Sequence, residues 1–171
     1  MSKDLRAILL TLLALALCIM VQSTILGWIA IRKVKPDLSL IVLIFVAMRR
    51  GSMVGQISGF ASGFLEDLMN HSPLGFHSLL KTLIGYLYGM LSGNVLIDPF
   101  FMPLVLAVVA TIMKGFLAGL ISVAFGIDSV GFHAFSGPLW IEVGYNGVLA
   151  PLLFALLNLV KGFTQADKEG S

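Results

Sequence analysis

The chain has 171 residues, of which 58% are hydrophobic and only 12% are charged, and its formal net charge is +2. Soluble domains carry about 25% charged residues, so this composition indicates an integral membrane protein. The net charge is small, and the sequence has no cluster of basic residues interspersed with aromatic residues. Both features argue against a nucleic-acid partner. Cys18 is the single cysteine, which excludes an intramolecular disulfide and a cysteine-ligated metal cluster.

Apolar runs bounded by charged residues, Pro or Gly predict six helices, at about 5–31, 37–48, 51–69, 75–94, 99–125 and 138–161. At roughly 20 apolar residues per span, the length fits one polytopic membrane domain over residues 1–171, a six-helix transmembrane bundle. The first run resembles a secretory signal, but it continues to Ile31, and Leu17 stands where a lipoprotein cleavage site needs a small residue. We therefore expect an uncleaved first helix.

The second predicted helix is short. Its apolar run, "LSLIVLIFVAM", covers about 16 Å at 1.5 Å per residue, whereas the hydrocarbon core is about 30 Å thick. We expect a short span helped by local bilayer thinning and by snorkelling of Arg49 and Arg50; a partly inserted helix is the alternative. Pro36 suits the start of this helix.

Six spans place both termini on one side of the membrane. If that side is cytoplasmic, the inner basic residues outnumber the outer ones, which favours cytoplasmic termini. The inner set is Lys3, Arg6, Arg49, Arg50, Lys161 and Lys168, and the outer set is Arg32, Lys33 and Lys35.

Glycine recurs every fourth residue along three predicted helices. In lipid, small residues let helix backbones approach closely and so form packing surfaces. We predict that these glycines pack the third, fourth and fifth helices together; a face for a partner protein is the alternative, and the two are compatible. The residues are Gly51, Gly55, Gly59 and Gly63, then Gly85, Gly89 and Gly93, then Gly115 and Gly119.

Ionisable residues gather where the third and fourth helices meet. Glu66 and Asp67 lie near the outer end of the third, and His77 and Lys81 share one face near the start of the fourth. Asp67 and His77 are about 3 Å below the turn and Lys81 about 9 Å, within reach of a flexible lysine stem. Asp67 therefore has His77 and Lys81 as cationic candidates across the hairpin.

We call Glu66, Asp67, His77 and Lys81 the polar clasp. Between its two halves, Pro73 fixes φ and Gly75 permits a positive φ, as a turn requires. The favoured interpretation is structural, a contact that fixes the register of the two helices. A docking site for a partner, and ion or proton handling or chemistry, are the alternatives.

Specific signals for chemistry are missing from the sequence. It contains no H-E-x-x-H, no G-x-x-x-x-G-K-[ST] and no G-x-G-x-x-G. Asp67 and His71 are four residues apart and could share a metal ion, but they lack a third ligand. We therefore expect no catalytic residue, no metal and no cofactor.

Two more charges lie inside predicted helices. Lys114 is near the middle of the fifth helix, and Glu142 is about one turn into the sixth. Their depths differ by roughly 10 Å, so a direct pair would need strong snorkelling. We expect each to face the bundle interior or a cavity, beside Tyr145, Asn146 or Asn158. A buried Lys114 is also the best sign of a small-molecule pocket.

Residues 36 to 89 contain a short "PDL" helix, a glycine-rich helix ending in an Asp, a turn with "LG" and a helix ending near "GYL". The residues that form these features are Pro36, Asp37 and Leu38; Gly59, Gly63 and Asp67; Leu74 and Gly75; and Gly85, Tyr86 and Leu87. In these features the stretch, about a third of the chain, resembles a known family, the bacterial rod-shape-determining membrane protein MreD.

The resemblance implies a component of the bacterial cell-elongation machinery in the cytoplasmic membrane, surrounded by membrane lipids. It implies MreC as the most direct partner, with MreB, RodA and a class B transpeptidase as complex members. It also implies a six-helix fold similar to the substrate-binding subunits of energy-coupling-factor vitamin transporters, and no catalytic residues.

On this basis we expect a non-enzymatic scaffold that binds MreC and supports lateral peptidoglycan synthesis and cell shape. The alternative is a small-molecule (vitamin-like) binding subunit of a membrane transporter, suggested by the shared fold and by Lys114. An intramembrane enzyme is a more distant third.

Overall fold

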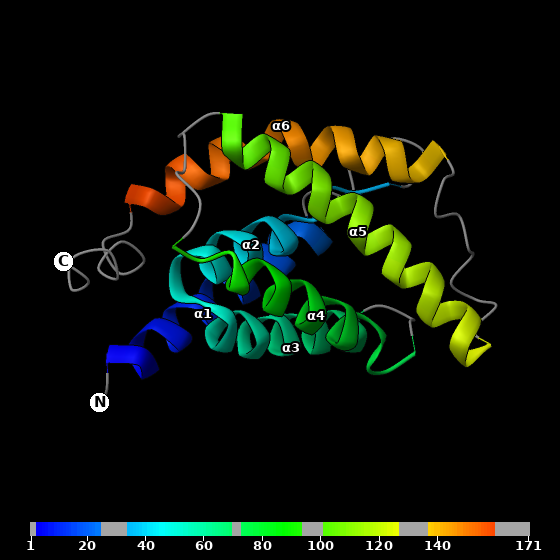
Figure 1. Ribbon diagram of the computed structural model, residues 1–171, viewed down its shortest axis with the longest axis horizontal. Helices are drawn as coiled ribbons and strands as arrows, with labels where there is room; N and C mark the ends of the chain where they lie inside the picture. Colours follow the sequence, from blue (N-terminus) through cyan, green and yellow to red (C-terminus); the bar gives the residue numbers. More distant parts are fainter. Residues whose placement is uncertain (1–2, 25–33, 70–72, 94–100, 127–136, 160–171) are drawn as a thin grey trace.

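The computed structural model describes residues 3–24, 34–69, 73–93, 101–126 and 137–159, and in these ranges it is all-helical, with six helices and no strand (Figure 1). The helices are α1 (Lys3–Thr24), α2 (Leu38–Arg50), α3 (Ser52–Met69), α4 (Phe76–Met90), α5 (Phe101–Phe125) and α6 (Gly137–Leu159). The prediction of six helices is therefore confirmed. Parts of the predicted helices lie outside the described residues, namely 25–31, 94, 99–100 and 160–161.

The ends of two helices differ from the prediction. Helix α4 ends at Met90. The amides of Leu91 and Ser92 donate to the carbonyls of Tyr88 and Gly89, three residues earlier, and so close a turn. Gly93 follows with φ +81°, and Gly51 ends α2 with φ +85°. A Cβ added at Gly51 or Gly93 would meet nothing within 4 Å. These two glycines supply the positive φ that ends a helix. The predicted packing role is wrong for the side-chain face of both, although the Gly51 carbonyl carbon does lie against Gly89 of α4.

Helix α2 lies in the centre of the molecule. Residues 39–48 are all buried, and α2 packs against each of the other five helices. The Phe45 ring meets the Phe154 ring of α6 edge-on, with 5.0 Å between centroids. Its 13 residues cover about 20 Å. A helix of this length is tolerated because protein, rather than lipid, surrounds it.

The last turn of α2 is held by α6. Arg49 lies over the Phe45 ring at 5.6 Å from the centroid and donates to Asn158 Oδ1 at 3.0 Å. Asn158 was expected beside Lys114 or Glu142, and this expectation is wrong, since Asn158 lies near the end of α6 while Glu142 lies near its start.

Helices α3 and α4 form an antiparallel hairpin and lie side by side (Figure 1). Their glycines face each other's backbone, so an added Cβ would overlap backbone atoms of the opposite helix. This close approach is the packing that small residues permit in lipid. An added Cβ would overlap the backbone of Lys81 from Gly59, of His77 from Gly63, of Gly85 from Gly55, of Gly55 from Gly85, and of Ser52 from Gly89.

Gly115 of α5 serves a different contact. A Cβ on Gly115 would lie 2.8 Å from Leu139 Cδ1 of α6, and Gly119 is buried. Gly115 therefore packs α5 against α6, and the expectation that it packs α5 with α3 and α4 is wrong.

Two of the described helices, α5 and α6, are long and apolar enough to cross a membrane by length and composition. A shorter apolar segment, Thr11–Gln22, lies within α1. Many large apolar side chains point outward, such as Met53 on α3, which is 73% exposed, and Val123 on α5, also 73% exposed. A membrane protein presents such a surface to acyl chains.

Candidate functional site

The site begins at Asp37, the N-cap of α2. Its carboxylate Oδ1 accepts the Leu40 amide at 3.0 Å, as an N-cap side chain should, and Pro36 precedes it. Its own amide donates to Asn146 Oδ1 of α6 at 2.9 Å. Because α2 is central, this cap places a carboxylate in the interior of the bundle, where the residue is only 5% exposed.

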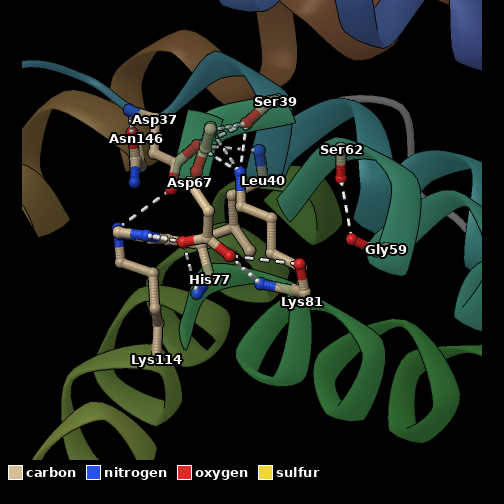
Figure 2. Close-up of polar contacts among 12 residues, drawn as sticks. Asp37, Ser39, Leu40, Gly59, Ser62, Asp67, His77, Lys81, Lys114 and Asn146 are labelled. Atoms are coloured by element: carbon tan, nitrogen blue, oxygen red, sulfur yellow. Dashed lines mark hydrogen bonds and ion pairs between the residues drawn. The ribbon is translucent and has the colours of Figure 1, made fainter. Parts of the chain in front are cut away.

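Two lysines converge on the Asp37 carboxylate from different helices (Figure 2). Lys81 Nζ of α4 lies 3.4 Å from Oδ1, and Lys114 Nζ of α5 lies 2.9 Å from Oδ2. Each lysine also pairs with a glutamate: Lys81 with Glu66 of α3 at 2.5 Å, and Lys114 with Glu142 of α6. We call Glu66, Lys81, Asp37, Lys114 and Glu142, in this spatial order, the charge network.

Neutral side chains complete this region. Ser39 Oγ lies 2.9 Å from Asp37 Oδ1 and 2.6 Å from Glu66 Oε1, and it accepts from Lys81 Nζ. On the α6 side, Asn146 Nδ2 donates to Thr111 Oγ1 at 3.0 Å. Both lysines and the Asp37 carboxylate thus have several partners each, as buried polar groups require.

The charge network links the segment before α2 to four helices. A buried ion pair adds little net stability over apolar residues of the same shape, but removing one partner costs about 3–5 kcal/mol because a charge is left uncompensated. The network therefore penalises any arrangement that separates α3 and α4 from α5 and α6. In physical terms it sets how the helices fit together.

A second cluster caps the start of α4. Gly75 is the N-cap of α4, with φ +95° and no side chain to accept the first amides of the helix. Asp67 of α3 does so instead: its carboxylate accepts the amides of Gly75 (2.9 Å), His77 (3.0 Å) and Ser78 (3.2 Å). It also accepts the Ser78 hydroxyl at 3.1 Å and contacts His77 Nδ1 at 2.8 Å. An anion here also interacts favourably with the helix dipole.

The turn before α4 has the predicted chemistry. The Phe76 amide donates to the Pro73 carbonyl at 3.2 Å, and Gly75 adopts the positive φ that the sequence predicted.

The structure brings together part of the polar clasp. Asp67 meets His77, but Lys81 pairs with Glu66 and Asp37, and the expected pairing of Asp67 with Lys81 is wrong. Adjacent helical residues point about 100° apart, so Glu66 and Asp67 serve two different sites. His71, the possible second ligand of a metal at Asp67, lies outside the described residues.

The expectation that Lys114 and Glu142 do not pair directly is also wrong. Depth counted along the sequence assumes that both helices run straight through the membrane. Helices α5 and α6 instead cross at an angle (Figure 1), which brings residues of unequal sequence depth together. Asn146 does lie in this region, as expected, and bonds to Asp37 and Thr111.

Sequence reasoning missed Asp37 and Ser39 as members of the site. The signal was present in "PDLS", where a Pro–Asp pair before an apolar run is typical of a capped helix start. A cap on a buried helix is itself buried, but the central position of α2 was not visible in its short apolar run.

Comparison with protein families matches residues 3–160 to the model described as rod shape-determining protein MreD. Comparisons with curated proteins and with solved structures give no match. The family match spans all six helices of the described structure and both clusters of buried charge.

Proposed function

The chain belongs to the MreD family of rod shape-determining proteins, and from this premise we propose that it is a non-enzymatic scaffold of the cell-elongation complex. Family membership gives it a role in rod-shape determination, in association with the rod-shape complex at the membrane. Within that role we propose that it binds MreC directly. RodA, MreB and a class B transpeptidase are the proposed further members of the complex, which supports lateral peptidoglycan synthesis.

The observation that supports a scaffold is the use of the buried ionisable groups. The charge network ties the segment before α2 to four helices, and Asp67 caps α4 from α3. Among the described residues, each of these groups bonds to a neighbouring segment of the same chain. Such groups stiffen the bundle, and a rigid bundle presents a fixed surface to partners.

We propose six spans in a single domain with both termini in the cytoplasm. In Figure 1 the start of α1 and the end of α6 lie on the same side, and α3 and α4 run in opposite directions, as do α5 and α6. Arg49 and Arg50, at the end of α2, fit the cytoplasmic side of this topology. Similarity to the substrate-binding subunits of energy-coupling-factor transporters remains part of the proposal.

The partner surface is proposed to be apolar side chains rather than glycines. The glycines of the α3–α4 hairpin face each other's backbone, and so are not open to a partner. Outward-facing side chains on α3 follow the 3–4 spacing of a helix–helix seam, with Phe60 and Phe64 stacked at 6.2 Å. These side chains are Met53, Ile57, Phe60, Phe64 and Leu68. On α5, Phe116 and Leu120 are exposed in the same way.

Photo-crosslinking in living cells tests this proposal. A photoreactive phenylalanine analogue replaces Phe60 (57% exposed) in one variant and Phe116 (58% exposed) in another, and the captured protein is identified. We expect at least one of these positions to capture MreC. Phe154 is 2% exposed and provides the matched control, which should capture no partner. Capture of lipid alone from both exposed positions, in cells that keep their rod shape, would refute direct binding through these faces.

The transporter alternative gains no support from the site. Lys114 suggested a pocket, but its ammonium group already binds Asp37 and Glu142. A ligand carboxylate would have to displace one of these partners.

A further inference from the structure

Helix α4 is shorter than the thickness of an ordinary bilayer. Its 15 residues cover about 22 Å, whereas the hydrocarbon core is about 30 Å thick. Both of its ends are fixed by the backbone: Gly75 precedes the helix with φ +95°, and the turn that follows Met90 leads to Gly93 with φ +81°. The helix therefore cannot be lengthened at either end without breaking a turn.

Helix α3 sets a similar limit on the other half of the hairpin. Its outward-facing apolar side chains begin at Met53, which is 73% exposed, and end at Met69, which is 49% exposed. These two residues are about 24 Å apart along the helix axis at 1.5 Å per residue. Inclining a helix only reduces the height that it spans. The apolar face of the α3–α4 hairpin is therefore at most about 24 Å high, roughly 6 Å less than the hydrocarbon core.

Unlike α2, helix α4 turns an apolar face outward. Helix α2 is enclosed by five helices, so its short length has no effect on lipid. The glycines of α4 at positions 85 and 89 face α3, which leaves large flexible side chains on the outward face, where acyl chains can surround them. These side chains are between 37% and 57% exposed, and they are Leu79, Leu83, Tyr86, Leu87 and Met90. Lipid thus meets a span that is too short for it.

The hairpin cannot adapt to a thicker bilayer at its outer end. Long charged side chains at the end of a short span can reach toward the headgroups and so extend it. Here Asp67 and His77 contact each other at 2.8 Å, and the ammonium group of Lys81 points inward to Glu66 and Asp37. The same contacts tie the hairpin to the start of α2, so it cannot slide along the membrane normal by itself.

Helices α5 and α6 can follow a thinner bilayer, because a long helix can tilt. Their 25 and 23 residues cover about 38 and 35 Å. Helix α5 is already inclined to the α3–α4 pair in Figure 1. A long helix can thus reduce the height that it spans, whereas a short helix cannot increase it. The hairpin therefore determines the thickness at which the whole bundle fits.

We propose that the α3–α4 hairpin thins the bilayer beside it and gathers lipids with short acyl chains along α4. The hydrocarbon core is about 24 Å thick against this face and returns to about 30 Å farther away. The inference rests on the six spans proposed above. It is independent of MreC binding, because it concerns the outward face of α4 and the surrounding lipid alone.

Quenching of tryptophan fluorescence by brominated lipid tests this inference on the purified full chain in vesicles. The native Trp28 and Trp140 are replaced by Phe. One reporter is then introduced as Leu87→Trp on α4 (42% exposed) or, as the matched control, as Leu152→Trp on α6 (68% exposed). The vesicles contain phosphatidylcholines whose acyl chains give hydrocarbon cores from about 22 to about 36 Å. Competition with one brominated reference lipid gives the relative affinity of each chain length at the reporter.

The two reporters should respond differently to chain length. At Leu87→Trp we expect the highest relative affinity for lipids with a core near 24 Å, and an affinity lower by roughly twofold at about 30 Å. At Leu152→Trp the affinity should change less over the same range, because α6 can tilt. Leu83→Trp lies on the same face of α4 (37% exposed) and should reproduce the result, so the test does not depend on one variant that folds.

Equal affinity for all chain lengths at both α4 positions would overturn the inference. Failure of brominated lipid to quench either α4 reporter would also overturn it, since a second copy of the chain would then cover this face. Thiol labelling of whole cells with an impermeant reagent tests the topology separately, in a Cys18→Ala background. Ser2→Cys and Leu74→Cys should react from opposite sides of the membrane. Reaction from one side would refute the six spans and the thinning together, whereas opposite sides with equal lipid affinities would refute the thinning alone.

Discussion

Replacing Gly59 by Ala tests the close approach of α3 and α4. The added methyl group would overlap the Lys81 carbonyl oxygen, and it would lie 2.6 Å from the Lys81 carbonyl carbon and 3.0 Å from the Thr82 amide nitrogen. These are backbone atoms, so no rotamer change can relieve the overlap and the helices must separate. Overpacking of this kind costs about 1–3 kcal/mol, and Ala recovers up to about 1 kcal/mol of helix propensity over Gly. We expect a net loss of roughly 1–2 kcal/mol.

Gly144→Ala is the matched control for this substitution. Gly144 lies within α6, is exposed, and a Cβ there would meet nothing within 4 Å. Only the propensity term acts, so the variant should gain up to about 1 kcal/mol. The free energy of unfolding of both variants can be measured by titrating the detergent-solubilised protein with SDS and following circular dichroism. If Gly59→Ala were as stable as Gly144→Ala, the two helices could not lie as close as described.

Further substitutions probe the α3–α4 hairpin and its neighbours. Gly55→Ala and Gly85→Ala should each lower the free energy of unfolding by about 1–3 kcal/mol. The double variant should lose less than the sum of these two values, because one separation of α3 from α4 relieves both overlaps. Additive losses in the same titration would contradict this. Asp67→Ala should cost about 2–3 kcal/mol, since it strands several donors. His77→Ala should cost only about 0.5–1.5 kcal/mol, because all three backbone amides keep their acceptor. Equal losses in the two variants would show that the contact with the imidazole ring, not the cap, is what matters. Tyr88→Phe removes the hydrogen bond from the tyrosine hydroxyl to the Leu106 carbonyl, and should lower the free energy of unfolding by about 1 kcal/mol. An unchanged melting temperature would place α4 farther from α5.

The sequence was sufficient for features that depend on local composition. Apolar runs located all six helices, because each is bounded by charged residues, Pro or Gly. The turn before α4 followed from Pro73 and Gly75, and the contact of Asp67 with His77 followed from their equal depth beside that turn. In each case the interacting residues are joined by a short segment, so sequence distance is a good guide to spatial distance.

The same reasoning failed where helices distant in sequence meet. The pairing of Lys114 with Glu142 depends on the crossing of α5 and α6, which no local pattern encodes. Asp37 could not be recognised as a site residue from the sequence, because its burial depends on the five helices that surround α2. The glycine repeat was informative only within helices: it continued through Gly51, where the backbone requirement of a helix end is the actual reason for glycine.

The glycine contacts and the charge network meet in one residue, Lys81. Its carbonyl lies against Gly59, and its ammonium group reaches Asp37 and Glu66. The length of a lysine side chain is fixed, so the ammonium group can reach the start of α2 only if the α4 backbone lies close to α3. A larger residue at position 59 would move the Lys81 backbone away and lengthen its bonds to both carboxylates. The effect of Gly59→Ala should therefore include a weakening of the charge network, and it should be smaller when Lys81→Met has already removed that network.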